Sequence, residues 1–257
     1  MIVPDIEGYE PAAVPYQIEA MGSFREQQAD FTQLRASLGT IKLELQGNLD
    51  FRTAVRSDGA VLKASGERLS DLGKFPAWSP PDEAFNLTAT LTGAANSLNV
   101  SEFQLRYGPS DLRGSMRLQT GGTPRIDMVA KSRQLDIRRF EPEDYTAAGT
   151  STTGAERRIP DLSIPVDLLT AANGSLQLDA ERFISRRLLF EKLQLDATLN
   201  NGNLTLDGDS DFSNGGTSKV TLQLQQRPGN LLHSELAVTA RNIRFELNQL
   251  DPSLQGT

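Results

Sequence analysis

Apolar and polar residues alternate one by one along most of the chain, and this period of two constrains the fold more than any other feature. Successive side chains of a β-strand point to opposite faces, so alternation gathers the apolar residues of a segment on one face. Ile41, Leu43 and Leu45, for example, alternate with Lys42 and Glu44. The pattern predicts strands with one apolar and one polar face, which is typical of an antiparallel sheet with one wet side.

The alternating segments are numerous and are separated by turn residues. Asn, Asp and Gly accept the positive φ that tight hairpins need, and they occur at Asp58-Gly59, Gly121-Gly122, Asn201-Gly202 and Asn214-Gly215-Gly216. We therefore predict an all-β chain that folds into a long antiparallel sheet. The alternation covers residues 16–20, 41–45, 49–55, 85–91, 103–107, 112–118, 126–130, 176–178, 193–199, 204–206, 220–224 and 236–240.

Few segments have the character of a helix. Residues 65–75, 165–171 and 243–250 are predicted to form short helices of one to three turns. Residues 76–82 contain three prolines around the only tryptophan and are predicted to form a loop.

One long segment, 141–160, interrupts the alternation and is rich in Thr, Ala, Gly and charged residues. This composition is typical of a mobile loop. We therefore predict β repeats over residues 1–140, a flexible loop or linker over 141–160, and a C-terminal β repeat over 161–257. The strands after the linker are expected to continue the first sheet.

Three segments end in a similar way, which indicates an internal repeat: residues 65–76, 132–142 and 240–252. Each unit would hold four or five strands that contact mainly their neighbours. Three such units would give about 12–15 strands and a sheet roughly 60–70 Å long. A sheet of that length is expected to twist and curl.

The predicted strands and turns also follow one another in a recognisable repeating order. It is carried by Phe85-Asn-Leu-Thr-Ala-Thr-Leu-Thr-Gly, by residues 98–105, 110–118, 124–128 and 135–137, and then by 164–169, 174–178, 193–195, Gly202-Asn-Leu-Thr-Leu and 236–243. These segments resemble the repeat of the AsmA family of bacterial envelope proteins. The likeness extends over most of residues 16–250 and contains no catalytic signature.

The AsmA resemblance implies a fold, a location and a role. The fold would be a long curled β-sheet with an apolar inner face, an open β-groove. The location would be the periplasm of a Gram-negative cell, with an N-terminal helix anchoring the protein in the inner membrane. The role would be outer-membrane biogenesis by phospholipid transport, with other envelope proteins as possible partners. This chain departs from the family in lacking the anchor helix, and we expect it to be a fragment whose anchor lies outside these residues.

Alternation and resemblance together predict an apolar floor for the acyl chains of phospholipids. Burial contributes about 0.8 kcal/mol per CH₂, and a row of equivalent apolar residues would let a chain slide. Alternation alone shows only that one face is buried, so the same residues could instead form an ordinary core. The candidate floor residues are Leu105, Met116, Leu118, Leu193, Leu195, Leu204 and Leu206.

Charge and composition argue against several classes of site. The net charge of -7 argues against nucleic acid, which requires a basic patch. Arg138-Arg139, Arg157-Arg158 and Arg186-Arg187 are short pairs, and each predicts a solvated edge or loop rather than a phosphate site. The chain has no cysteine for disulfides or thiolate metal sites. No stretch approaches the roughly 20 apolar residues of a membrane-spanning helix.

Catalytic and metal motifs are incomplete in this sequence. His233 is the only histidine, and no Gly-x-Ser-x-Gly elbow accompanies it, so it is predicted to be a polar strand residue. Asp207, Asp209 and Asp211 have the spacing that begins a calcium loop, but Phe212 stands where that loop needs glycine. We expect no enzymatic activity, no cofactor and no metal.

Two other function classes remain open. A structural or adhesive β-repeat module, such as a β-solenoid, would bind protein or glycan instead of lipid. Its core would be packed solid, whereas a lipid conduit would keep an open apolar trough. A carbohydrate-active β enzyme would need converging acids and aromatic residues, but aromatic residues make up 6% of the chain and are scattered.

Overall fold

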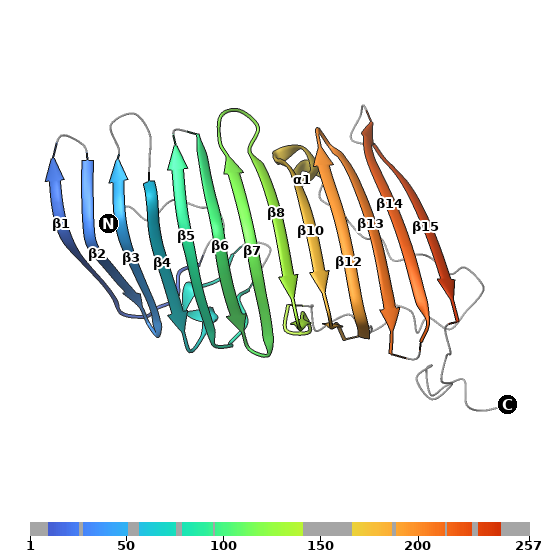
Figure 1. Cartoon of the computed structure of the whole chain (residues 1–257), viewed down its shortest axis with the longest axis horizontal. Coiled ribbons are helices and arrows are strands. Elements are labelled where there is room, and N and C mark those ends of the chain that lie inside the picture. Colours follow the sequence, from blue (N-terminus) through green and yellow to red (C-terminus); the bar gives the residue numbers. More distant parts are fainter. Residues whose placement is uncertain are drawn as a thin grey trace.

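The computed structural model describes residues 10–25, 28–50, 57–75, 79–94, 96–140, 166–186, 189–213, 215–227 and 231–242. This part of the chain is nearly all β (Figure 1). Its elements in chain order are β1 (Tyr16–Arg25), β2 (Gln28–Leu38), β3 (Ile41–Asp50), β4 (Ser57–Gly66), the 3-10 helix η1 (Leu69–Leu72), β5 (Phe85–Ala94), β6 (Ser97–Tyr107), β7 (Ser110–Gln119), β8 (Arg125–Ser132), β9 (Leu135–Asp136), α1 (Val166–Ala171), β10 (Asn173–Ala180), β11 (Phe183–Ile184), β12 (Leu189–Asn200), β13 (Asn203–Phe212), β14 (Thr217–Arg227) and β15 (Leu231–Arg241).

The strands form one long sheet that does not close, which confirms the predicted all-β, curled, open architecture. Thirteen strands follow one another in a row in chain order, with β1 and β15 at the two edges (Figure 1). The short strands β9 and β11 pair with each other beside this row. Twelve steps of about 4.8 Å make the sheet roughly 60 Å long. Each strand contacts mainly its two neighbours, as the repeat pattern predicts.

Hairpin turns connect most of the strands, and the Asn201-Gly202 turn confirms its prediction. Both residues have positive φ, 48° and 81°, and Asn200 pairs with Asn203 across the turn. The prediction for Asp58-Gly59 is wrong, because this dipeptide lies within β4. There Gly59 has a φ of 133° and interrupts the register with β5, so its positive φ serves a bulge instead of a turn.

Two strand pairs, β8–β10 and β9–β11, differ from the predicted antiparallel arrangement. β8 and β10 are parallel, with Arg125 opposite Asn173 and Ser132 opposite Ala180. Parallel neighbours require a long crossover, because the chain must return to the end of the sheet from which the first strand started. Residues 133–172, which include the predicted linker, make that crossover. Residues 141–160 themselves lie outside the described residues.

The predicted helices are only partly present. η1 covers four residues of the predicted segment 65–75, whose beginning belongs to β4 instead. α1 agrees with the predicted helix 165–171, and the segment 243–250 lies outside the described residues.

A small second layer covers the end of the sheet where β4 and β8 finish, the lower end in Figure 1. The buried Asp71 holds η1 in this layer, and the buried Asp136 lies beside it in β9, a strand of the sheet itself. Asp71, in η1, accepts hydrogen bonds of 2.7 Å from both the backbone N and the Oγ1 of Thr40, which precedes β3. The backbone N of Asp136, in β9, donates a 2.9 Å hydrogen bond to the Oγ of Ser110, which opens β7.

Away from this end the sheet has no thick core. Among the described residues, no large side chain is fully buried. The most deeply buried apolar side chains in the strands are mostly small, such as Ala60, Ala89, Ala130 and Ala180. In a single layer, neighbouring side chains cover an alanine, whereas a leucine rises above them and keeps part of its surface in water. The structure therefore leaves a broad apolar surface.

Candidate functional site

The register of the strands aligns apolar side chains into rows that cross the sheet. Directly opposed residues of neighbouring strands point to the same face, so pairing can be followed from strand to strand. We call the side that carries these rows the apolar face. One row, from β6 to β15, comprises Val100, Met116, Met128, Leu176, Ala197, Leu206, Leu222 and Leu236.

All seven predicted floor residues lie on the apolar face. Alternation within strands and register between strands agree on this placement. Met116 and Leu206 belong to the row named above, and Leu118 and Leu204 belong to the adjacent row, which also contains Ile126 and Leu199. Leu195 lies in a third row, opposite Leu178, and Leu193 pairs with Ala180. Leu105 pairs with Leu87 and with Leu112.

Most of the apolar face is open rather than packed, although Val100 and Leu224, which belong to its rows, are buried. Each of the seven floor residues is half-buried, covered by its lateral neighbours and still in contact with solvent. Exposure is largest at the two edges, where Tyr16 of β1 is 60% exposed and Leu236 of β15 is 65% exposed. Contiguous exposed apolar surfaces of this kind mark sites that bind a partner or a ligand.

The dimensions of the face follow from strand geometry. Leu193, Leu195, Ala197 and Leu199 point to it from β12, and six residues at about 3.4 Å give roughly 20 Å along the strand. The apolar face therefore measures roughly 60 Å by 20 Å.

The sequence prediction of the floor did not include several residues that belong to these rows. Val100, Met128, Leu176 and Leu222 lie beside the predicted ones. Their alternation was visible in the sequence, but which residues stand opposite each other depends on bulges. At Val100 a shift of register places Phe103, three residues later, on the same face. No local sequence pattern predicts this shift.

A hollow of about 620 Å³ lies over the opposite, polar face. Asn99, Arg117, Asp127, Ser175 and Thr198 line it and stand opposite one another across five strands, β6 to β12. The trough was predicted over the apolar floor, whereas this hollow lies on the other side of the sheet. Short serine and threonine side chains between longer ones account for part of its depth.

The polar face is held by ion pairs and hydrogen bonds. Asp127 accepts a bidentate pair of 2.8 Å bonds from Arg125 and a 2.7 Å bond from Ser175 Oγ. The Arg125 bonds, followed by the Ser175 bond, hold the pKa of Asp127 below its usual range. Arg117 Nε donates to Asn99 Oδ1 at 2.9 Å. These contacts fix side chains across strands, and a polar ligand would have to compete with them.

The three aspartates considered for calcium lie two residues apart on β13 and so share the polar face. Asp207 accepts a 2.9 Å hydrogen bond from Thr221, and Asp209 lies 3.9 Å from Lys219 Nζ. Within the described ranges, no three His, Cys, Asp or Glu side chains form a group that could hold a metal ion.

His233 also lies on the polar face, on the edge strand β15. Its Nε2 is 3.2 Å from Glu235 Oε1, two residues along the same strand. The adjacent hydroxyl, Ser234, stands opposite Leu224 and points to the apolar face. Ser234 therefore lies on the opposite face of β15 from the His233 ring.

The comparisons with known proteins do not assign a family. No family model, no curated protein and no solved structure matches the chain. In the part of the chain that the structure describes, neither helix is long and apolar enough to cross a membrane. The AsmA resemblance and its implied location stay predictions.

Proposed function

We propose that the apolar face binds the acyl chains of phospholipids and lets them move along the sheet. One observation carries this proposal: rows of mostly half-buried apolar side chains continue across the sheet and are still partly exposed at its edges. An ordinary core would cover such residues with a second layer. In the described residues such cover is limited to η1 at the lower end and to α1, with its buried Leu169, at the upper end (Figure 1).

The size of the face suits an acyl chain. A chain in one leaflet spans about half of the 30 Å hydrocarbon core, roughly 15 Å, which is less than the width of the face along the strands. Full burial contributes about 0.8 kcal/mol per CH₂, and a flat face covers roughly one side of the chain. A contribution near half that value per CH₂ would hold the chain without a deep minimum, because the next strand, about 4.8 Å away, offers similar contacts.

The setting of this activity is part of the proposal. The chain would act without catalysis as an AsmA-like component of the Gram-negative envelope, in the periplasm, and would be anchored to the inner membrane through a segment outside these residues. Its role would be phospholipid transport for outer-membrane biogenesis, with other envelope proteins as possible partners. The pattern of strands and turns supports this assignment, and the open apolar face is compatible with it.

Native mass spectrometry with lipid extraction tests the proposal on chain purified from a Gram-negative periplasm. We expect phospholipid to co-purify with the wild type. Leu195→Arg combined with Leu206→Arg should abolish it, because two guanidinium groups on neighbouring strands would interrupt the apolar rows.

A matched control is available on the same strands. Gln194→Arg combined with Thr205→Arg adds the same charges one residue away, on the polar face. This variant should keep its lipid, and both variants should keep a β-type circular dichroism spectrum. A wild type free of lipid, or equal loss in both variants, would contradict the proposal.

A second candidate function rests on the hollow over the polar face. Its hydrogen-bonding side chains suit a polar ligand, which favours the alternative of a structural or adhesive module that binds protein or glycan. The sheet is mostly antiparallel, whereas the strands of a β-solenoid run parallel. Binding of a glycan or peptide that is lost in Arg117→Ala, together with a lipid-free apolar face, would favour this candidate.

A further inference from the structure

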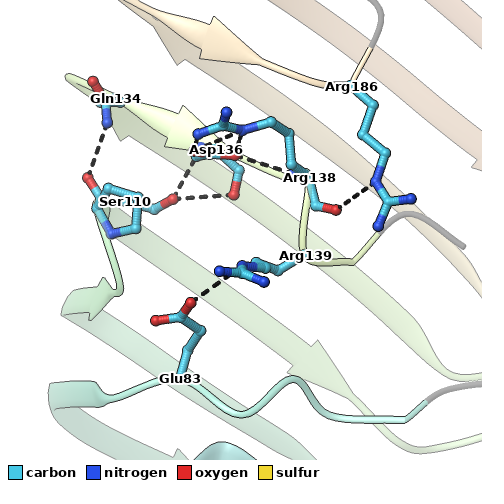
Figure 2. Close-up of polar contacts among 8 residues, drawn as sticks. Glu83, Ser110, Gln134, Asp136, Arg138, Arg139 and Arg186 are labelled. Carbon is cyan, nitrogen blue, oxygen red and sulfur yellow. Dashed lines mark hydrogen bonds and ion pairs between the residues drawn. The ribbon is translucent and has the colours of Figure 1, made fainter. Parts of the chain in front are cut away.

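Three arginines from distant parts of the sequence converge at the lower end of the sheet. Arg138 and Arg139 follow β9, and Arg186 follows β11, the strand that pairs with β9 (Figure 2). Arg186 Nε donates a 3.1 Å hydrogen bond to the backbone oxygen of Arg138. Strand pairing thus joins two short basic segments that looked like separate solvated loops in the sequence.

These side chains form a pocket at the end of the apolar face. We call it the arginine pocket; its volume is about 360 Å³. Tyr107 connects it to the apolar face, because this residue follows Leu105 by two positions in β6 and pairs with Phe85. The pocket is lined by Glu83, Tyr107, Pro109, Asp136, Arg138, Arg139 and Arg186.

Carboxylates orient two of the guanidinium groups. Arg138 bonds Asp136 through both Nε and Nη2, and Arg139 Nε lies 3.3 Å from Glu83 Oε1. Within the described residues these pairs leave further N–H donors on both arginines. Three guanidinium groups and two carboxylates line the pocket, on a chain whose net charge is -7.

A buried hydroxyl in the same pocket lacks a partner. Tyr107 is 6% exposed, and its hydroxyl makes no hydrogen bond in the described part of the chain. Such a group is unfavourable unless something supplies an acceptor. Burial, and then the nearby charge of Glu83, raise the pKa of Tyr107 to about 12. The hydroxyl therefore keeps its proton at neutral pH and can donate it to an oxygen atom.

We propose that the arginine pocket binds a phosphate group, with Arg138 and Arg139 as charged donors and the Tyr107 hydroxyl as a neutral one. Guanidinium forks match the oxygen geometry of phosphate and form short, charge-assisted hydrogen bonds with it. The volume is at the small end of ligand pockets, which suits a phosphate ester with a short substituent.

The position of the pocket points to a phospholipid headgroup, and this part of the inference rests on the proposed function. Tyr107 and Leu105 lie about 6.8 Å apart along β6. A phosphate held at Tyr107 would therefore place the acyl chains of the same molecule over Leu105 and the rows beyond it. A free phosphate ester would use the pocket without the apolar face.

Isothermal titration calorimetry on the full chain distinguishes these sources. The probes are inorganic phosphate, glycerol 3-phosphate and monomeric dihexanoylphosphatidylglycerol. We expect all three to bind, more weakly at higher ionic strength. The short-chain lipid should bind at least about tenfold more tightly than glycerol 3-phosphate, because its chains add apolar burial.

Variants separate the pocket from the apolar face. Arg139→Gln should weaken all three probes by about five- to tenfold. Tyr107→Phe should weaken them by about threefold or more without loss of stability at neutral pH. Arg113→Gln, which removes the same charge from the polar face of β7, is the matched control and should change affinity by less than about twofold. Leu105→Asn should weaken only the lipid.

Each failure has a different meaning. If neither inorganic phosphate nor glycerol 3-phosphate binds, or if Arg113→Gln weakens them as much as Arg139→Gln, the pocket is not a phosphate site. If they bind as expected but the lipid has no advantage, the phosphate site stands and its link to lipid is wrong. If the lipid depends on Leu105 but not on Arg139, the proposed function is supported and the pocket is refuted.

Discussion

Removing the carboxylate of Asp71 should detach the small layer at the lower end of the sheet. Its Oδ2 accepts two 2.7 Å hydrogen bonds from Thr40, and the residue is 4% exposed. A hydrogen bond to a charged group contributes about 1.5–3 kcal/mol. The Arg68 pair at 3.4 Å adds little, because the arginine is half exposed. Asp71→Ala should therefore lower the free energy of unfolding by at least about 3 kcal/mol.

The pH dependence of this effect has a definite sign. The two Thr40 bonds hold the pKa of Asp71 below its ordinary value of 3.8. On acidification the unfolded chain therefore takes up the proton before the folded one. The contribution is complete above about pH 4 and is lost as the pH falls through the folded-state pKa. The difference between the wild type and Asp71→Asn should shrink accordingly from pH 7 to pH 3.

Urea unfolding followed by far-ultraviolet circular dichroism measures both effects. Asp82 is the matched control, since it is an exposed aspartate nearby that accepts one hydrogen bond, from Ser70. Asp82→Ala should cost less than about 1 kcal/mol. A cost below about 1 kcal/mol for Asp71→Ala, or a difference between wild type and Asp71→Asn that does not vary with pH, would refute the role given to this carboxylate.

Three further outcomes follow from the geometry. Gly114→Ala should lower the free energy of unfolding, measured with heat or urea, by at least about 2 kcal/mol, because the added Cβ would lie 1.9 Å from a carbonyl oxygen of β8. Gly208→Ala is the control: its added Cβ would have its nearest neighbour at 3.6 Å, and the free energy of unfolding should change by less than about 0.5 kcal/mol. Leu224→Lys should cost about 3 kcal/mol, since this side chain is 3% exposed, and Leu236→Lys on the exposed edge less than about 0.5 kcal/mol. Stability should fall between pH 10 and about 12, because the unfolded chain loses the Tyr107 proton first, and Tyr107→Phe should flatten that fall in alkaline unfolding experiments.

The face of each strand was predictable because alternation is a local property. Leu193, Leu195 and Leu206 needed only their own neighbours in sequence to be placed on one side. Asn201-Gly202 was equally readable, because a two-residue turn between two alternating segments leaves one register. The open sheet followed from the repetition of these signals.

Features that depend on distant pairing were not readable. The parallel β8–β10 pair requires a crossover, and no residue in either strand differs from those of an antiparallel one. Gly59 supplies a positive φ that serves a bulge as well as a turn, so Asp58-Gly59 was misassigned. Arg138 and Arg186 meet only because β9 pairs with β11. The sequence separates them by 48 positions, and each basic segment alone is ordinary.

Site-specific photo-crosslinking tests the central claim, lipid contact on the apolar face, most directly. A photoreactive residue would replace Leu206 in one variant and Thr205 in another, two adjacent positions of β13 that point to opposite faces. Cells labelled with radioactive phosphate would be irradiated, and the chain purified under denaturing conditions. We predict a labelled phospholipid adduct at position 206 and none at 205. Equal labelling at both positions would contradict the claim that lipid contacts the apolar face. The absence of labelling both at position 206 and at an equivalent replacement of Leu195 would contradict this claim as well.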